Sequence, residues 1–567
     1  MTGEPRPIAT PIATPIATPI ATPIGMPAAK APPPRGVAAG KGAAAPEGAG
    51  TVVNPYLIAM VVSMAAFMEV LDTTITNVSL THIAGSLAAS QDESTWVLTS
   101  YLVANGIVLP LSGWLAGVMG RKNFFMLCIG GFTFASLACG LATSLPMLII
   151  FRLVQGLAGG GLQPMQQAIV MDSFPPEKRG TAFAITGMTM IVAPVLGPTL
   201  GGFITDNYSW RWIFFMNIPV GCLALFLVGR LVVDPLHAKA KGLLSIDYIG
   251  LSLVALGLGA MQIVLDKGQE EDWFGSNFIL TFTAIGAAAL LAAILWLVRQ
   301  KDPIIDLRLI GRRSFGLACL MVFFVGFALY GCSTLLPLLV QSQFGYDSMT
   351  AGMVLSPGGL ALIFLMPVVG KLVNRIQARY LIAFGMFMVG IGMWATSHVT
   401  PQTDYQTFVM LRILQVVGLP FLFIPSSTMA FSSIPPEKSS KASALYSLMR
   451  NLGGSFGISL LLSFETRHQQ LHQSVLAAHL SPANPVYRAT FDHYVSAIMA
   501  LGRTHAAAAA IATGRIYRQL IGQSTILAYA DTFRFVAIIV FCLAFVALFM
   551  PRNDPHRKPS PDAAGAH

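Results

Sequence analysis

Fourteen long apolar segments, separated by short polar stretches, constrain this sequence more than any other feature. A helix needs roughly 20 mostly apolar residues to cross a bilayer, and each segment is long enough. Only 11% of the residues are charged, against about 25% in an ordinary globular protein, so most of the surface must face lipid. The predicted crossings are residues 54–78, 96–117, 123–142, 145–171, 180–204, 211–233, 244–265, 276–298, 314–340, 349–369, 379–398, 405–431, 440–463 and 529–550.

The first fifty residues have a different composition. Four tandem Pro-Ile-Ala-Thr units run from Pro7 to Thr22, and a mixture of Pro, Ala and Gly follows them. Such a segment has too little bulky apolar surface to offset the entropy of ordering, so it is predicted to be disordered. Prolines at every fourth position also break any signal-peptide helix, which indicates that the tail stays attached.

The basic residues define an orientation, because cytoplasmic loops retain an excess of Lys and Arg. With the amino terminus inside, 24 of the 35 Lys and Arg residues fall on the inner side, and both termini are predicted to be cytoplasmic. The net charge of +10 is scattered in small groups between apolar runs. This pattern indicates membrane orientation and no nucleic-acid partner.

An internal repeat is visible at a shift of 260 residues. The string FPPEKRGTAFAITGM at 174–188 recurs as IPPEKSSKASALYSL from Ile434, and the same shift carries Arg152 onto Arg412. Two duplicated halves facing a central cavity are a known transporter architecture. The predicted fold is an all-α integral membrane protein with two six-helix bundles and two inserted transmembrane helices. In chain order, the predicted parts are a disordered cytoplasmic tail (1–50), the N-terminal six-helix bundle (51–233), the two inserted helices (234–300), the C-terminal six-helix bundle (301–550) and a cytoplasmic tail (551–567). The C-terminal bundle includes an extracytoplasmic segment at about 464–528.

Two carboxylates, Glu69 and Asp72, lie deep in the first crossing. Their spacing places them on one helix face, about a turn apart. A charge at mid-membrane costs about 2.5–3.5 kcal/mol even on the lenient insertion scale, so these residues should face a cavity and carry a proton or bind a substrate cation. A structural interpretation remains open, in which Asp72 bonds the neighbouring threonines and Glu69 reaches toward the interface.

Arginines supply the opposite charge inside the membrane. Arg152, in the fourth crossing, is predicted to pair with Asp72 or Glu69, although its early position in the span also allows it to reach the outer interface. The glycines that follow it, from Gly156 to Gly161, permit close approach of a neighbouring helix. Further candidates for lining the cavity are Asn77, Gln155, Arg412 and Arg450.

Two further strings suggest conformational roles. The fifth crossing combines small residues at four-residue spacing with two prolines, which predicts a bent helix with a flat packing face. Between the second and third crossings lies a tight basic turn, which either locks against a neighbouring helix end or merely sets the topology. The residues are Ala193, Pro194, Gly197, Pro198, Gly201 and Gly202 in the fifth crossing, and Gly113, Gly120, Arg121 and Lys122 in the turn.

No enzyme signature accompanies these features. The sequence has no His-Glu-x-x-His, Gly-x-Ser-x-Gly or Walker string, and its six cysteines all lie in apolar runs. His468 and His472 have helical spacing in the outer segment, but a solvated helix explains them better than a zinc site. We therefore predict no enzyme activity, no metal and no cofactor.

The combined strings resemble the fourteen-helix drug:proton antiporter family of the major facilitator superfamily, in particular its EmrB type. They are L-D-T-T-I-T-N-V from Leu71, G-W-L-A-G-V-M-G-R-K from Gly113, R-L-V-Q-G from Arg152, A-P-V-L-G-P-T-L-G-G from Ala193 and W-R-W-I-F-F-M-N-I-P-V-G from Trp210. The fifth-crossing string is the most specific of these, since it separates exporters from importers. Two positions depart from the family pattern: Gly117 stands where the loop motif usually has Asp, and Ala193 where the antiporter motif has Gly.

The resemblance implies a multidrug efflux transporter driven by the proton gradient, with amphipathic small molecules as substrates. It also implies residence in the bacterial inner membrane, with a periplasmic membrane-fusion adaptor and an outer-membrane channel as partners of a tripartite system. The usual gating salt bridge does not carry over, because Gly117 has no side chain. Export of a single metabolite such as a siderophore or an organic acid, import of such a compound, and a non-transporting membrane sensor remain open alternatives.

Overall fold

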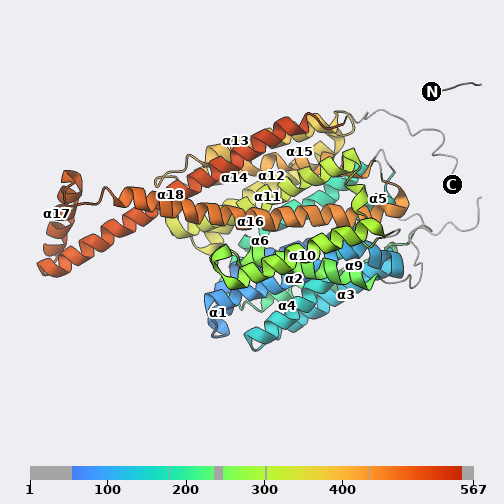
Figure 1. Cartoon of the computed structure of the whole chain (residues 1–567), viewed down its shortest axis with the longest axis horizontal. Helices are drawn as coiled ribbons and strands as arrows, with labels where there is room; N and C mark the ends of the chain where they lie inside the picture. Colours follow the sequence, from blue (N-terminus) through green and yellow to red (C-terminus); the bar gives the residue numbers. More distant parts are fainter. Residues whose placement is uncertain (1–53, 176–177, 235–246, 301–302, 433, 552–567) are drawn as a thin grey trace, which may run out of the picture. The chain divides into compact units, whose positions relative to one another are not determined.

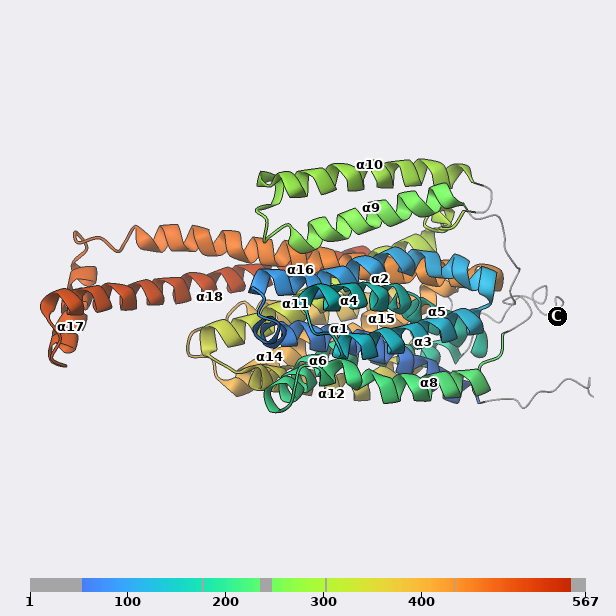
Figure 2. The same cartoon turned by 90° about the horizontal axis from the view of Figure 1, so that it is seen from below.

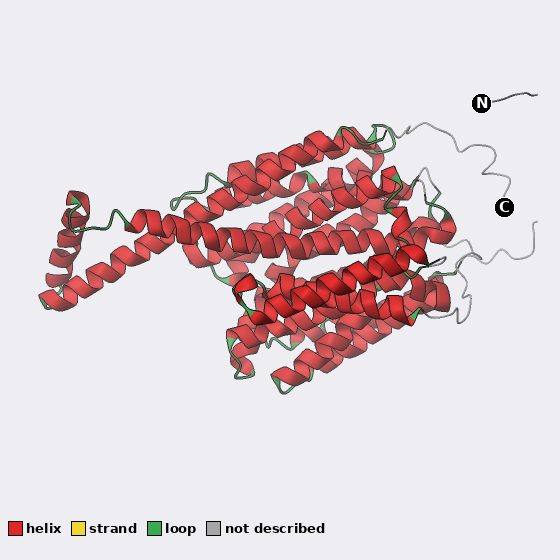
Figure 3. Ribbon diagram, viewed as in Figure 1, coloured by secondary structure: helices red, strands yellow, loops and turns green. Residues whose placement is uncertain are grey.

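The structure, a computed structural model, describes residues 54–175, 178–234, 247–300, 303–432 and 434–551. These residues form helices and loops, with no strand among them (Figure 3). The all-α membrane fold predicted from the sequence is confirmed. The predicted tail at 1–50 lies outside the described residues, as does the carboxyl-terminal tail from residue 552 onward.

Local signals set the starts of the first helices. The Asn54 side chain caps the first helix, which has Pro55 at its first position, and Ser90 with Glu93 forms a capping box at the second. The helices of the first half are α1 (Pro55–Ser86), α2 (Gln91–Met119), α3 (Arg121–Gly140), α4 (Leu145–Gly159), α5 (Leu162–Ser173), α6 (Arg179–Asn207), α7 (Trp212–Phe215) and α8 (Asn217–Leu231).

Two helices separate the halves, and the second half repeats the register of the first. Helices α4 and α14 start 260 residues apart, and so do α6 and α16. The inserted helices are α9 (Tyr248–Lys267) and α10 (Asn277–Arg299), with the short helix η3 (Trp273–Gly275) between them. The second half contains η4 (Leu307–Leu309), α11 (Arg313–Phe344), α12 (Ser348–Leu372), α13 (Ala378–Thr396), α14 (Tyr405–Val417), α15 (Leu419–Phe431), η5 (Pro436–Lys438), α16 (Ser439–Ala477), α17 (Pro485–Met499) and α18 (His505–Ala547).

The number of membrane crossings is close to the prediction. Within the described residues, 12 helical spans are long and apolar enough to cross a bilayer, and the bent α6 makes 13. The remaining predicted crossing is the thirteenth, residues 440–463. It lies in α16, where serines, glycines, Asn451 and Arg450 lower the hydropathy. Helix α16 is packed against α2, α11 and α18, so its polar residues are covered by protein rather than lipid.

Several predicted boundaries are wrong. Helix α16 continues to Ala477, beyond the predicted end at residue 463, and α18 begins at His505, before the predicted start at residue 529. No helix-breaking proline marks the point where either helix leaves the apolar zone. The fourth and twelfth predicted crossings, by contrast, match the single spans Leu145–Ser173 and Tyr405–Phe431. Each span is interrupted at a glycine, between α4 and α5 and between α14 and α15. The outer segment is helical, as predicted, and places α17 beside the projecting start of α18, beyond the ends of the remaining helices (Figure 1).

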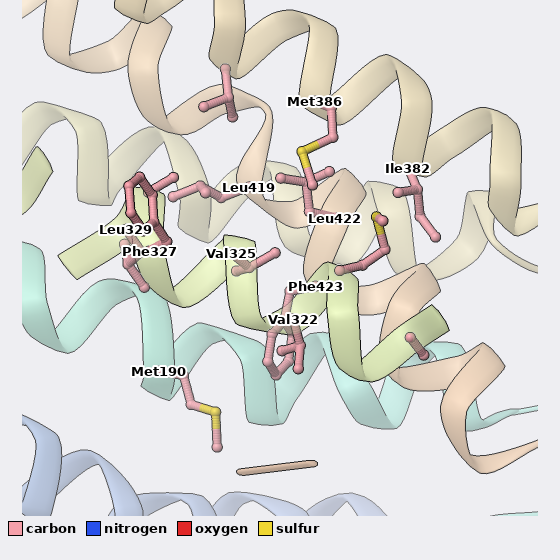
Figure 4. Close-up of a cluster of buried hydrophobic side chains, with 14 of the residues drawn as sticks. Met190, Val322, Val325, Phe327, Leu329, Ile382, Met386, Leu419, Leu422 and Phe423 are labelled. Atoms are coloured by element: carbon pink, nitrogen blue, oxygen red, sulfur yellow. The ribbon is translucent and has the colours of Figure 1, made fainter. Parts of the chain in front are cut away.

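The two halves meet along helix pairs that are distant in sequence. Helix α6 packs against α12, and α2 packs against α16. The inserted α9 contacts α2 and α16, while α10 lies at the outer edge against α9 (Figure 2). Met190 of α6 joins the apolar core of the second half, near Val322 and Phe423 (Figure 4). The polar residues described next therefore lie between tightly packed helices.

Candidate functional site

Asp72 lies at the centre of a polar cluster in the first half. Arg152 Nη1 donates to Asp72 Oδ2 at 2.6 Å, and both side chains are fully buried. Asp72 Oδ1 accepts from Gln155 Nε2 at 3.1 Å and from Asn217 Nδ2 at 2.7 Å. Helices α1, α4 and α8 thus meet at one carboxylate. The predicted pairing of Arg152 is present, and the alternative position at the outer interface is excluded.

Arg152 is held on two further sides. Its Nε donates to the Val97 carbonyl at 3.2 Å, and its guanidinium lies 4.4 Å from the centroid of the Tyr101 ring. Glycines at the end of α4 and directly after it allow this proximity to α2: a Cβ at Gly160, the C-cap residue, would come within 2.8 Å of the Asn105 carbonyl oxygen. The glycine run after Arg152 therefore packs α4 on α2, as its composition predicted.

Glu69 has a separate set of partners. Its Oε1 accepts from Tyr101 Oη at 3.0 Å and from Asn105 Nδ2 at 3.1 Å, and its Oε2 accepts from Gln163 Nε2. The other end of the Gln163 amide accepts from Arg450 Nη2 of α16. Glu69 is thereby connected to the second half through one glutamine, while Asp72 is paired within the first half.

The Asp72–Arg152 pair holds two opposite charges away from water. A buried carboxylate paired with a guanidinium is stable only while both charges are present, because loss of one leaves the other desolvated and unpaired. Tyr101 contacts both networks, since its hydroxyl binds Glu69 and its ring faces Arg152. Within the described ranges, no group of three His, Cys, Asp or Glu side chains is placed to hold a metal ion.

The remaining cavity candidates lie elsewhere. Arg412 Nη1 donates to Gln415 Oε1 at 3.3 Å and its Nη2 to Ser333 Oγ at 2.9 Å, inside the second half. Arg450 extends toward the first half and contacts Gln163 and the sulfur of Met190. Asn77 is exposed on α1 and belongs to neither carboxylate network. The structure therefore joins Gln155 and Arg152 to Asp72, but not Arg412 or Asn77.

The antiporter-like string forms the packing face of α6. A Cβ at Gly197 would lie 2.6 Å from Thr74 Cβ, and one at Gly201 would lie 3.2 Å from the Ile75 Cα, so both glycines face α1. Ala193, Pro194, Pro198 and Gly202 are also buried along this helix. The axis bends by 43° between Arg179–Pro194 and Leu196–Asn207, where proline removes a backbone donor.

The basic turn ties several helix ends together. Gly120 adopts a positive φ of 85°, which glycine tolerates best, and it is the N-cap residue directly before α3. Arg121 forms an ion pair with Asp172 and donates from Nη2 to Ser439 Oγ of α16 at 2.7 Å. Lys122 Nζ donates to the Gly229 carbonyl at 2.7 Å, near the end of α8. The turn therefore connects the start of α3 with α5, α8 and α16, and Gly117 contributes no side chain to these contacts.

Gly113 completes this contact between the halves. A Cβ there would lie 2.8 Å from the Lys441 Cα, so α2 and α16 touch through their backbones. Ser443 Oγ donates to the Pro164 carbonyl at 2.7 Å close by. We call the end of the molecule that carries Arg121, Lys122 and Lys441 the basic end; the halves are in direct contact there.

Sequence reasoning missed four polar partners of the carboxylates. Each is an uncharged polar residue within a predicted crossing, and each can donate a hydrogen bond. The sequence signal that could have identified them is a polar side chain inside an apolar segment, because a polar group in the membrane needs a hydrogen-bond partner. These residues are Tyr101, Asn105, Gln163 and Asn217.

A comparison with known families defines the class of protein. The family profile of the Major Facilitator Superfamily matches residues 62–458. The chain belongs to this superfamily and is a membrane transporter rather than an enzyme.

Individual relatives confirm the resemblance to the EmrB type. The chain is 36% identical over 494 residues to "Multidrug export protein EmrB" of Escherichia coli (strain K12), covering 87% of this chain and 94% of the relative. It is 36% identical over 441 residues to "Fatty acid resistance protein FarB" of Neisseria gonorrhoeae, covering 77% and 86%. It is 30% identical over 488 residues to "Colistin resistance protein EmrB" of Acinetobacter baumannii, covering 86% and 94%.

Solved structures show the same fold at low identity. A double-tryptophan mutant of XylE gives a TM-score of 0.57 at 12% identity, with 88% of this chain and 96% of that chain covered. The human organic anion transporter MFSD10 gives a TM-score of 0.55 at 13% identity, covering 87% and 99%. These two likenesses concern the fold alone.

Proposed function

We propose that this protein is a proton-driven antiporter that exports amphipathic drugs or other toxic compounds across the cytoplasmic membrane. The observation that carries the proposal is the buried pair of Asp72 and Arg152, joined at 2.6 Å between α1 and α4. The relatives support an export role, because their names describe multidrug export and resistance to fatty acids and to colistin.

Protonation of Asp72 is the coupling step. A proton arriving from the acidic outer side neutralises Asp72, breaks its pairing with Arg152 and favours release of the substrate there. Loss of the proton on the inner side restores the ion pair and prepares the cavity for the next substrate. The energy source is the proton gradient, without a cofactor.

Orientation follows from the basic end. Lys and Arg gather there, so it faces the cytoplasm and both termini lie on that side. The contacts of Arg121 with Ser439 and of Gly113 with Lys441 then close the cytoplasmic end. The bent α6, packed on both α1 and α12, is the helix about which the halves move.

The outer segment is the site for a periplasmic membrane-fusion adaptor. Where the segment leaves the bundle, α16 and α18 are joined by two side-chain contacts. Gln469 Nε2 donates to Thr525 Oγ1 at 2.7 Å, and His472 Nε2 lies 2.7 Å from Asp531 Oδ2. Further out, Val486 and Leu501 are 73% and 81% exposed. Such apolar residues on a projecting helical unit provide a contact surface for a partner. The adaptor and an outer-membrane channel would complete a tripartite system.

A direction assay tests the proposed export. Inverted membrane vesicles are given a proton gradient, acidic inside, and the accumulation of a fluorescent amphipathic cation and of a fatty acid is followed. Export predicts accumulation of at least one compound, its loss with a protonophore, and its persistence after ATP depletion. Uptake in the opposite direction, or accumulation that requires ATP, would contradict the proposal.

A further inference from the structure

The internal repeat gives the second half a counterpart of the Asp72 site that has no carboxylate. The 260-residue shift carries Arg152 onto Arg412 and Gln155 onto Gln415, but it carries Asp72 onto Cys332. Helices α1 and α11 hold the two members of this last pair. The second half has therefore kept the guanidinium and the amide while lacking the carboxylate.

Arg412 is a buried cation without an acidic partner. It is only 1% exposed, and its two bonded neighbours, Gln415 and Ser333, are both uncharged. Across the described residues, no Asp or Glu forms an ion pair with it, and its Nε has no hydrogen-bond partner. Arg152, by contrast, has both a carboxylate and the Tyr101 ring.

An uncompensated guanidinium is costly at this depth. Arginine remains charged in proteins, and an isolated buried ion must be neutralised by a counter-charge or it destabilises the fold strongly. Arg412 lines a cavity together with Cys332 and Gln415, and the other lining residues are apolar, including Leu329 and Leu419. Figure 4 shows Leu329 and Leu419 within the core of the second half.

We propose that this cavity binds a small monovalent anion of the chloride type, which takes the place that Asp72 has in the first half. The cavity volume is about 10 Å³, close to the smallest volume that can hold one water molecule. Met393 also lines it, and its flexible thioether can yield to an ion slightly larger than water. The apolar walls and small size exclude an amphipathic substrate, so this site is separate from the proposed transport cavity.

Halide-dependent thermal stability tests the site without relying on transport. The purified protein is heated in sodium chloride and in sodium gluconate at equal ionic strength, and the unfolding midpoint is followed by intrinsic fluorescence. The expected result is a saturable rise of several degrees in chloride, and also in bromide, because the ion binds only the folded state.

Two substitutions identify the location. Cys332→Asp supplies the missing carboxylate and should abolish the halide response, whereas Cys332→Ser cannot supply a charge and should keep it. If Cys332→Asp fails to fold, anomalous scattering from bromide must show an ion beside Arg412 in the unaltered protein. Equal midpoints in chloride and gluconate, a full response in Cys332→Asp, or no bromide at Arg412 would overturn the proposal.

Discussion

Two carboxylates one helical turn apart have different electrostatic roles in this protein. Asp72 is paired with a fully buried guanidinium, while Glu69 accepts hydrogen bonds from three uncharged side chains. Neutralising Asp72 therefore leaves Arg152 unpaired, whereas neutralising Glu69 mainly alters hydrogen bonds. The two positions should respond differently to the same chemical change.

Removing Arg152 alone should destabilise the protein more than removing the pair. Arg152→Met leaves Asp72 charged and buried, at a cost of about 3–5 kcal/mol. Combining it with Asp72→Asn removes the unpaired charge, so the unfolding midpoint of the double variant should rise again. The measurement is thermal unfolding of the purified variants, and a double variant less stable than Arg152→Met would contradict the ion pair.

Amide substitutions should separate the two carboxylates. Glu69→Gln preserves shape and part of the hydrogen bonding, so proton-coupled transport should continue at a reduced rate. Asp72→Asn should abolish coupling while still permitting substrate binding. Substrate-driven pH changes and equilibrium binding, measured on both variants, distinguish the roles. Loss of coupling in Glu69→Gln alone would move the proton site to Glu69.

At the scale of the helix, close packing depends on glycines that face particular neighbours. Gly197 meets Thr74 of α1, and Gly352 of α12 meets the backbone of Thr199, where a Cβ would lie 2.5 Å from its Cα. Helix α6 thus contacts both halves through surfaces without bulky side chains. A helix that moves between two states needs such smooth faces, because larger side chains interlock.

Gly197→Ala should impair transport through this contact. The added methyl group would lie 2.6 Å from Thr74 Cβ, so α1 and α6 must separate. We expect a several-fold loss of transport rate at normal expression. Gly106→Ala is the matched control, because a Cβ there has no other atom within 4 Å. Equal effects of the two substitutions would show that helix propensity, rather than packing, is responsible.

The sequence predicted the helices far better than their interactions. Apolar length and Lys/Arg distribution determine where a helix crosses a membrane, and both are local in sequence. The pairing of Asp72 with Arg152 was predictable because two opposite charges inside a membrane require each other. Asn217 and Gln163 were missed, since an uncharged side chain has many satisfactory partners and only the packing selects one. The ends of α16 and α18 were missed because the apolar zone ends there while the helix continues.

On the scale of the whole molecule, the basic end and the outer segment are separate parts of the structure. The halves are locked together at the basic end by Arg121 and Gly113. The outer segment packs into its own small core of Val495, Ile498, Ala508 and Ala512. Its loss should therefore leave the transport machinery intact.

Replacing residues 478–504 with a short Gly-Ser linker tests this independence. Transport by the purified protein in proteoliposomes should be unchanged, because the base contacts of Gln469 and His472 remain. Drug resistance of cells should fall to the level of cells without the transporter, since the proposed adaptor would lose its contact surface. Full resistance with the shortened protein would contradict the proposed adaptor contact.

Proton movement by the purified protein tests the central claim most directly. The protein is reconstituted in liposomes with an internal pH indicator, an imposed pH gradient and a panel of cationic and anionic amphiphiles, with Asp72→Asn as the comparison. The account predicts proton flux that depends on at least one amphiphile and is absent in Asp72→Asn. Undiminished substrate-dependent flux in Asp72→Asn, or no flux with any compound in the folded unaltered protein, would contradict it.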